Sequence, residues 1–214
     1  MAGGTSDTTG VGYTVVGVEE AKLRPRPGVA GLWDRFIGPG AARVENALIL
    51  LWAVLCAATV VTHALVAELG WSALQLAVVA LLAFDIAGGV PANASNCAKR
   101  WYHRTGQGFG EHFGFPLIHV HPFALALLFP GFGWGTAATI YAYLLVAATV
   151  VLLTPLYLKR PVAFVLYSMA LLAGLYALGV PPGLEWFVPL FFLKLLVAHL
   201  LPEEAYRPHK EEVQ

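Results

Sequence analysis

The chain contains few charged residues. Only 12% of its 214 residues are Asp, Glu, Lys or Arg, and 58% are hydrophobic, whereas a typical soluble domain carries about 25% charged residues. Positive and negative charges balance, and no basic or acidic block points to a nucleic acid partner. The composition therefore predicts a protein whose solvent is lipid, with membrane lipids as its surroundings.

Cysteine is scarce as well. The chain has two cysteines, Cys56 and Cys97, and lacks a CxxC spacing, which argues against a disulfide framework and a thiolate metal site. A signal-peptide pattern is also missing from the polar, Gly-rich first 45 residues. We find no internal repeat, which argues against an inverted-repeat transporter.

Long apolar runs are what the sequence does contain. Each approaches the roughly 20 residues that a helix needs to cross a bilayer, and helices satisfy their backbone groups internally. The six predicted spans are residues 47–66, 72–90, 113–129, 136–157, 161–178 and 186–201. The third and sixth are short, and Gly88, Gly89 and Pro91 are expected to end the second early. The prediction is an all-α bundle of six transmembrane helices.

Lys and Arg occupy alternate connectors between these spans. They precede the first span and follow the second, fourth and sixth, and the other three connectors contain neither. Because Lys and Arg accumulate in cytoplasmic loops, the alternation predicts a multi-pass protein with both termini in the cytoplasm, expected in a bacterial-type inner membrane. Five or seven spans would break the pattern.

These boundaries divide the chain into three parts. Residues 1–45 form a polar, partly disordered cytoplasmic segment, residues 46–203 the six-helix domain, and residues 204–214 a cytoplasmic tail. Within the first part, Trp33, Phe36 and Ile37 are spaced to face lipid together, so residues 31–40 are expected to lie along the membrane interface.

The polar residues concentrate in one stretch. Residues 85–121 contain one Asp, two Asn, one Glu and four His. Ionisable groups are unfavourable at membrane depth, so such a cluster is a functional-site hypothesis. The predicted topology places it in the cytoplasmic half, together with His199 and Glu203 near the end of the sixth span. The sequence therefore predicts one site that faces the cytoplasm.

Imidazole and carboxylate ligands favour Fe or Zn. The candidate metal ligands are His112, His119, His121 and His199. His112 and His119 are seven residues apart and share a helix face, whereas His121 can join them only where a proline distorts the helix. His199 and Glu203 have the i, i+4 spacing by which one helix offers two ligands. Any single His here is more typical of a packed or interfacial residue than of a metal ligand.

Lys194 lies near the middle of the sixth span, too deep to reach either surface easily. Asp85 is the one acid within another predicted span, so the two are expected to pair. Such a pair could transfer protons or bind substrate. A purely structural pair, or a Lys made neutral by burial, is the equally weighted alternative.

The connector after the second span supplies the candidate substrate-binding residues, which are Asn93, Asn96, Trp101 and Tyr102. The two Asn side chains could hydrogen-bond a ligand or cap a short helix. The Trp101–Tyr102 pair is followed by His and Arg, and this run is equally typical of an anchoring girdle at the membrane interface.

The sequence favours a membrane-embedded, metal-dependent enzyme. Its catalytic residues would be Asp85, Lys194 and Glu203. Because His/carboxylate iron sites support oxidation, the expected reaction is oxidation or hydroxylation of a lipid, isoprenoid or other apolar small-molecule substrate.

Three alternatives stay open. A metal-free cyclase or isomerase would use Asp85 and a His as proton donor and acceptor. A haem-bearing electron carrier would use two His on facing helices, such as His119 and His199. A proton-coupled transporter would use the ionisable set as a relay, although the groups lie on one side of the membrane.

Overall fold

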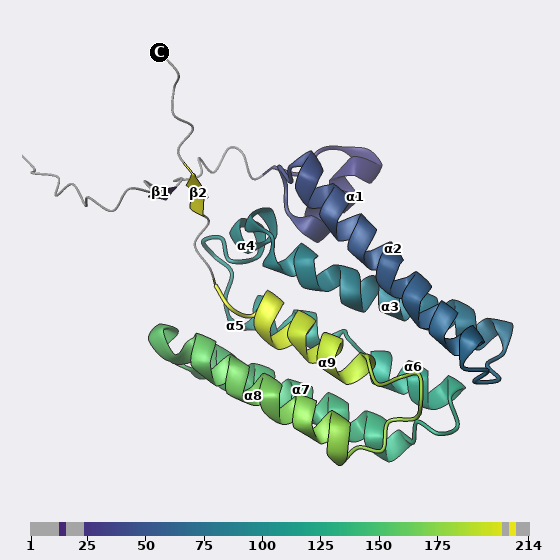
Figure 1. The fold of residues 1–214 in the computed structure, drawn as a ribbon. Helices are drawn as coiled ribbons and strands as arrows, with labels where there is room; N and C mark the ends of the chain where they lie inside the picture. The colour runs from purple at the N-terminus through teal and green to yellow at the C-terminus, as the bar shows by residue number, and fades with distance from the viewer. Residues whose placement is uncertain (1–12, 16–23, 203–205, 209–214) are drawn as a thin grey trace, which may run out of the picture.

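The computed structural model describes residues 13–15, 24–202 and 206–208. Within these ranges the fold is a bundle of α-helices (Figure 1), as the sequence predicts. Four helices are long and apolar enough to cross a membrane: α2 (Arg43–Val66), α3 (Ala73–Ala94), α7 (Trp134–Leu153) and α8 (Leu156–Tyr176). The shortest has 20 residues, or roughly 30 Å at 1.5 Å per residue. These lengths indicate a membrane protein.

The predicted third and sixth spans are built differently. The third is two short helices, α5 (Phe109–Leu117) and α6 (His121–Leu128), with a break over residues 118–120. Pro122 stands in the first turn of α6, where its fixed φ favours a new helix start and restricts the residue before it. The sixth is α9 (Phe187–Phe192), which continues as the π-helical segment η2 (Leu193–His199). Four long candidate spans are thus accompanied by two segments, each built from two short elements.

The second span does not end early. Helix α3 continues past Gly88, Gly89 and Pro91 to Ala94, so that expectation is wrong. A proline near the end of a buried helix removes one backbone donor, and neighbouring elements can compensate for that loss. The extra turn carries Asn93 into the bundle, where it is buried.

The bundle has two chemically different ends (Figure 1). The three connectors without Lys or Arg meet at one end, where residues 69–71, 129–131 and 181–182 line a common hollow. At the opposite end lie α1 (Gly28–Ile37), α4 (Asn96–Tyr102) and the end of η2, joined by contacts of Tyr102 and Lys99. We call this the basic end.

The centre of the bundle is formed by α9 and η2. Phe187, Phe191, Phe192, Leu195 and Leu196 are almost fully buried against α3, α7 and α8. In contrast, α2 and α8 expose most of their apolar side chains. Exposed apolar faces of this size are expected where the solvent is lipid.

Helix α1 is docked onto the basic end. Its Asp34 accepts hydrogen bonds from Arg26 through the backbone N (2.8 Å), Nε (2.9 Å) and Nη2 (2.7 Å), and the guanidinium holds the pKa of Asp34 below its usual range. Phe36 is exposed, but Ile37 is fully buried and packs against Ile49. The expectation that Ile37 faces lipid is therefore wrong, because the end of α1 packs on the bundle instead.

Outside the bundle, β1 (Tyr13–Val15) pairs antiparallel with β2 (Tyr206–Pro208). The predicted catalytic residue Glu203 and most of the terminal segments fall outside the described residues.

Candidate functional site

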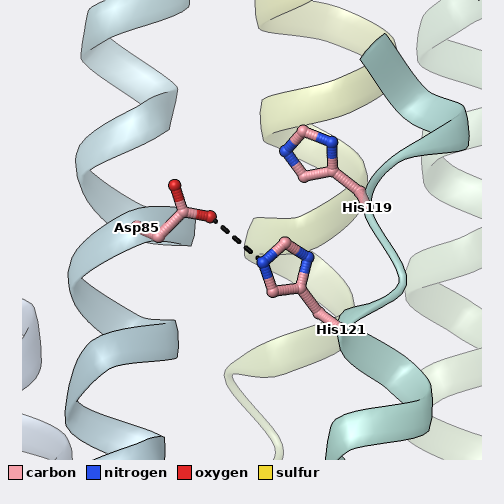
Figure 2. Close-up of side chains that lie close together, drawn as sticks. All are labelled: Asp85, His119 and His121. Atoms are coloured by element: carbon pink, nitrogen blue, oxygen red, sulfur yellow. Dashed lines mark ion pairs between the residues drawn. The ribbon is translucent and has the colours of Figure 1, made fainter. Parts of the chain in front are cut away.

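Asp85, His119 and His121 meet between α3 and the break that separates α5 from α6, and we call these three residues the inner cluster. Each offers one ligand atom, and these atoms lie within 4.8 Å of one another. Asp85 extends from α3 toward the segment between α5 and α6, from which both imidazoles point back (Figure 2). The shortest approach is 3.4 Å, between His121 Nε2 and Asp85 Oδ2.

The helix break is what brings the two imidazoles together. On a continuous helix, residues two positions apart point about 200° away from each other. The break over residues 118–120 removes this constraint, and the rings of His119 and His121 lie 5.1 Å apart between centroids. The condition stated from the sequence, a distortion near the prolines, is met.

The tautomer of His119 is fixed by its neighbour. Its Nδ1 lies 2.6 Å from the carbonyl oxygen of Phe115. A carbonyl only accepts, so Nδ1 donates and carries the proton. Nε2 of His119 is then left with a free lone pair, the state that a metal ligand or a proton acceptor requires.

Lys194 adjoins the inner cluster. Its Nζ donates to Asp85 Oδ2 at 2.7 Å, and the Lys194 side chain is 1% exposed whereas that of Asp85 is 35% exposed. Gly89 makes room for this approach, because a Cβ there would overlap Lys194 Cε. The buried ammonium and the carboxylate thus compensate each other inside an apolar bundle, as such charges must.

The other histidines gather at the basic end. We call Tyr102, His103, His112 and His199 the basic-end cluster. The rings of His103 and His112 stack at 4.5 Å, and those of His112 and His199 lie 6.1 Å apart. His103 Nε2 donates to the carbonyl oxygen of His199 at 2.9 Å. The four predicted metal ligands are therefore divided between two places.

The imidazole of His199 contacts aromatic rings rather than polar atoms. Its imidazole stacks on Phe115 at 3.9 Å and contacts Tyr102 at 5.2 Å. Neither ring nitrogen has a hydrogen-bond partner among the described residues, although the residue is 2% exposed. Burial also lowers the pKa of His103 to about 4 and raises that of Tyr102 to about 12. Both of these groups are therefore neutral at pH 7.

The predicted substrate-binding residues do not form one surface. Asn93 is buried, and its Nδ2 has no partner among the described atoms. Asn96 begins α4, but Ser95 caps that helix. Tyr102 donates to the Phe36 carbonyl at 2.8 Å. The ring of Trp101 lies under the Arg104 guanidinium at the basic end.

Two residues that contact these clusters, Phe115 and Lys99, are not among the site residues predicted from the sequence. Phe115 accepts from His119 and stacks on His199, and its spacing of four residues before His119 is the one signal that could have indicated it. Lys99 donates to the carbonyl oxygens of Ala198 and Leu201 at 2.5 and 2.6 Å. Nothing in its sequence context distinguishes it from an interfacial basic residue.

No family model, curated protein or solved structure matches this chain.

Proposed function

We propose that the chain is a membrane-embedded enzyme in which Asp85, His119 and His121 bind a transition metal, Fe or Zn, and that it oxidises or hydroxylates an apolar substrate. The observation that carries the proposal is the convergence of three ligand atoms within 4.8 Å. Ligands at about 2.0–2.2 Å from a metal lie roughly 3–3.5 Å from one another. Small side-chain rotations would therefore close the site.

The donor set supports a catalytic metal rather than a structural one. Two His and one carboxylate with open positions are typical of oxygen-activating non-haem Fe(II) sites. Three protein ligands plus an open position are equally typical of catalytic Zn. When bound, the metal would supply activation of oxygen or water. The Phe115 carbonyl orients His119 for ligation, as hydrogen-bond partners of metal-bound His commonly do.

Lys194 would position the carboxylate. Its ammonium holds Asp85 Oδ2 toward His121 and keeps the charge of the carboxylate compensated before a cation binds. The apolar surroundings exclude water and suit a lipid, isoprenoid or similar substrate that arrives through the membrane.

We also propose that all six segments cross the membrane, with both termini in the cytoplasm of a bacterial-type inner membrane. The gathering of the connectors without Lys or Arg at one end, and of α1 and α4 at the other, supports this topology.

A second candidate function rests on the same residues. Asp85 Oδ2 contacts both Lys194 Nζ (2.7 Å) and His121 Nε2 (3.4 Å). An ammonium, a carboxylate and an imidazole in sequence can move a proton without a metal. Such a site would suit a cyclase or isomerase of apolar substrates.

Elemental analysis of the purified protein separates the two candidates. We expect about one Fe or Zn per chain in the wild type, after loading with either metal, and its loss in His119→Ala. His63→Ala is the control, because His63 is an exposed His on α2. A folded wild type that retains neither metal would contradict the first candidate and leave the second.

A further inference from the structure

Helix α1 presents an apolar surface outward. Its buried residues recur every three positions, and its exposed large apolar residues recur at intervals of three and four, so the two sets lie on opposite sides of the helix. Exposed apolar surfaces of this kind mark contacts with a protein or a membrane. We call Val29, Leu32 and Phe36 the apolar face of α1. The buried residues are Gly31, Asp34 and Ile37, and the exposed ones are Val29 (84%), Leu32 (65%) and Phe36 (42%).

The bundle holds α1 beside the first two turns of α2. Trp33 Nε1 donates to Asn46 Oδ1 at 2.7 Å, and Ile37 packs with Ile49. Because α2 is a candidate span, its first turns are expected near the boundary between lipid headgroups and acyl chains. This is the depth at which an amphipathic helix lies along a membrane. The position of α1 therefore favours a membrane over a soluble protein as the surface that covers its apolar face.

The exposed charges beside this face are positive. Residues 24–44 contain four Arg and one Asp, and the acid, Asp34, is buried and accepts from Arg26 Nη2 at 2.7 Å. The Arg26 side chain is nevertheless 63% exposed. Arg35 is exposed too, three positions after Leu32 and hence next to the apolar face. Two guanidinium groups thus act on one buried carboxylate, which leaves an excess of positive charge at the edge of the apolar face.

Contacts with α4 fix the orientation of α1. Tyr102 Oη donates to the Phe36 carbonyl oxygen at 2.8 Å, and Cys97 Sγ donates to the Ile37 carbonyl oxygen at 3.1 Å. Both carbonyls belong to the last turn of α1, where a helix supplies no partner of its own. The apolar face and the two guanidinium groups are therefore held in place before any lipid binds.

We propose that α1 docks on an anionic lipid surface, with its apolar face among the acyl chains and the guanidinium groups of Arg26 and Arg35 on the headgroup phosphates. Arg is suited to this role because its planar fork binds phosphate oxygens through two hydrogen bonds. Each positive side chain close to an anionic membrane strengthens binding by about fivefold. The inference rests on neither the metal site nor the reaction proposed above.

Quenching by lipid tests where the apolar face lies. The full-length protein, with a genetically encoded fluorophore in place of Leu32, is reconstituted in vesicles of phosphatidylcholine and phosphatidylglycerol that carry brominated acyl chains. We expect bromine to quench this fluorophore several-fold more than the same fluorophore in place of Thr105, an exposed residue of the connector after α4. Equal quenching at the two positions would overturn the inference and assign the apolar face to a protein partner.

Titration with lipid tests the role of charge. In detergent-solubilised protein, the fluorophore at position 32 should respond to phosphatidylglycerol at a lower concentration than to phosphatidylcholine. Arg35→Gln should raise the required concentration of phosphatidylglycerol by about fivefold. Arg35 is the position to change, because Arg26 also pairs with Asp34 and its loss would disturb the fold around α1.

Lys159→Gln is the matched control. It removes one positive charge near the start of α8, whereas α1 packs on α4, so the response to phosphatidylglycerol should stay at the wild-type concentration. Equal responses to the two lipids, or equal effects of Arg35→Gln and Lys159→Gln, would overturn the inference. Neither measurement involves a metal, so both outcomes are independent of the proposed function.

Discussion

The two histidine clusters are built from the same residue type, yet they differ in what their nitrogens face. In the inner cluster, His119 and His121 direct nitrogens toward one carboxylate. In the basic-end cluster, the rings of His103 and His112 stack on each other, and His199 stacks on Phe115. A histidine count thus says little about ligation, whereas convergence on a carboxylate separates a candidate metal site from aromatic packing.

Charge compensation separates the clusters further. Asp85 and Lys194 bring opposite charges into the inner cluster, at a separation of 2.7 Å. The described side chains of the basic-end cluster include no carboxylate. The inner cluster should therefore be sensitive to the removal of single charges, and the basic-end cluster to the loss of ring volume.

The largest expected effect on stability comes from Asp85→Asn. It leaves the buried ammonium of Lys194 without its partner and should destabilise the protein by about 3–5 kcal/mol. Lys194→Met should cost less, because the carboxylate left behind keeps His121 Nε2 as a neighbour at 3.4 Å from Asp85 Oδ2. Unfolding in detergent measures both. Equal losses, or no recovery in the double variant Asp85→Asn/Lys194→Met, would show that the pair does not control stability.

Gly89→Ala should have the next largest effect. Its Cβ would push Lys194 away from Asp85, and overpacking of this kind costs about 1–3 kcal/mol. Gly114→Ala on α5 is the control, because its Cβ would meet nothing within 4 Å. The unfolding temperature and the amount of bound metal should both fall in Gly89→Ala, and neither should fall in Gly114→Ala. If both alanines behave alike, the close approach of Lys194 is not a constraint.

The basic-end cluster should instead affect how the free energy of unfolding depends on pH. Burial lowers the pKa of His103 to about 4, whereas an unfolded His titrates near 6.5. Between these two pH values the unfolded chain binds more protons than the folded chain, so the free energy of unfolding rises with pH. Above about pH 6.5 His103 is neutral in both states, and its effect on the free energy of unfolding no longer changes. His103→Asn should flatten the slope of unfolding free energy between pH 4 and 6.5. An unchanged slope would mean that His103 does not titrate as a buried group.

The smallest effect is expected for His199→Phe. The phenyl ring keeps the stacking on Phe115, and no described partner of the imidazole nitrogens is lost. Stability should change by less than about 1 kcal/mol, and bound metal should stay. His119→Phe, the same change in the inner cluster, should remove the metal. Loss of metal in His199→Phe would contradict the claim that the inner cluster binds the metal and the basic-end cluster does not.

The four long spans could be predicted because long apolar runs specify membrane helices directly. The contact between Asp85 and Lys194 could be anticipated too, since each was the conspicuous charge in its span. The break between α5 and α6 could not be located, because Pro116 lies inside α5 while Pro122 starts α6. The separation of His112 from His119 follows from that break, so helical spacing alone wrongly grouped them.

X-ray absorption at the metal edge tests the central claim most directly. On the metal-loaded protein it should report two imidazole nitrogens and a carboxylate oxygen at about 2.0–2.2 Å, and Asp85→Asn should change that oxygen contribution. A shell of three imidazoles, unaffected by Asp85→Asn, would place the metal at the basic end and contradict the claim.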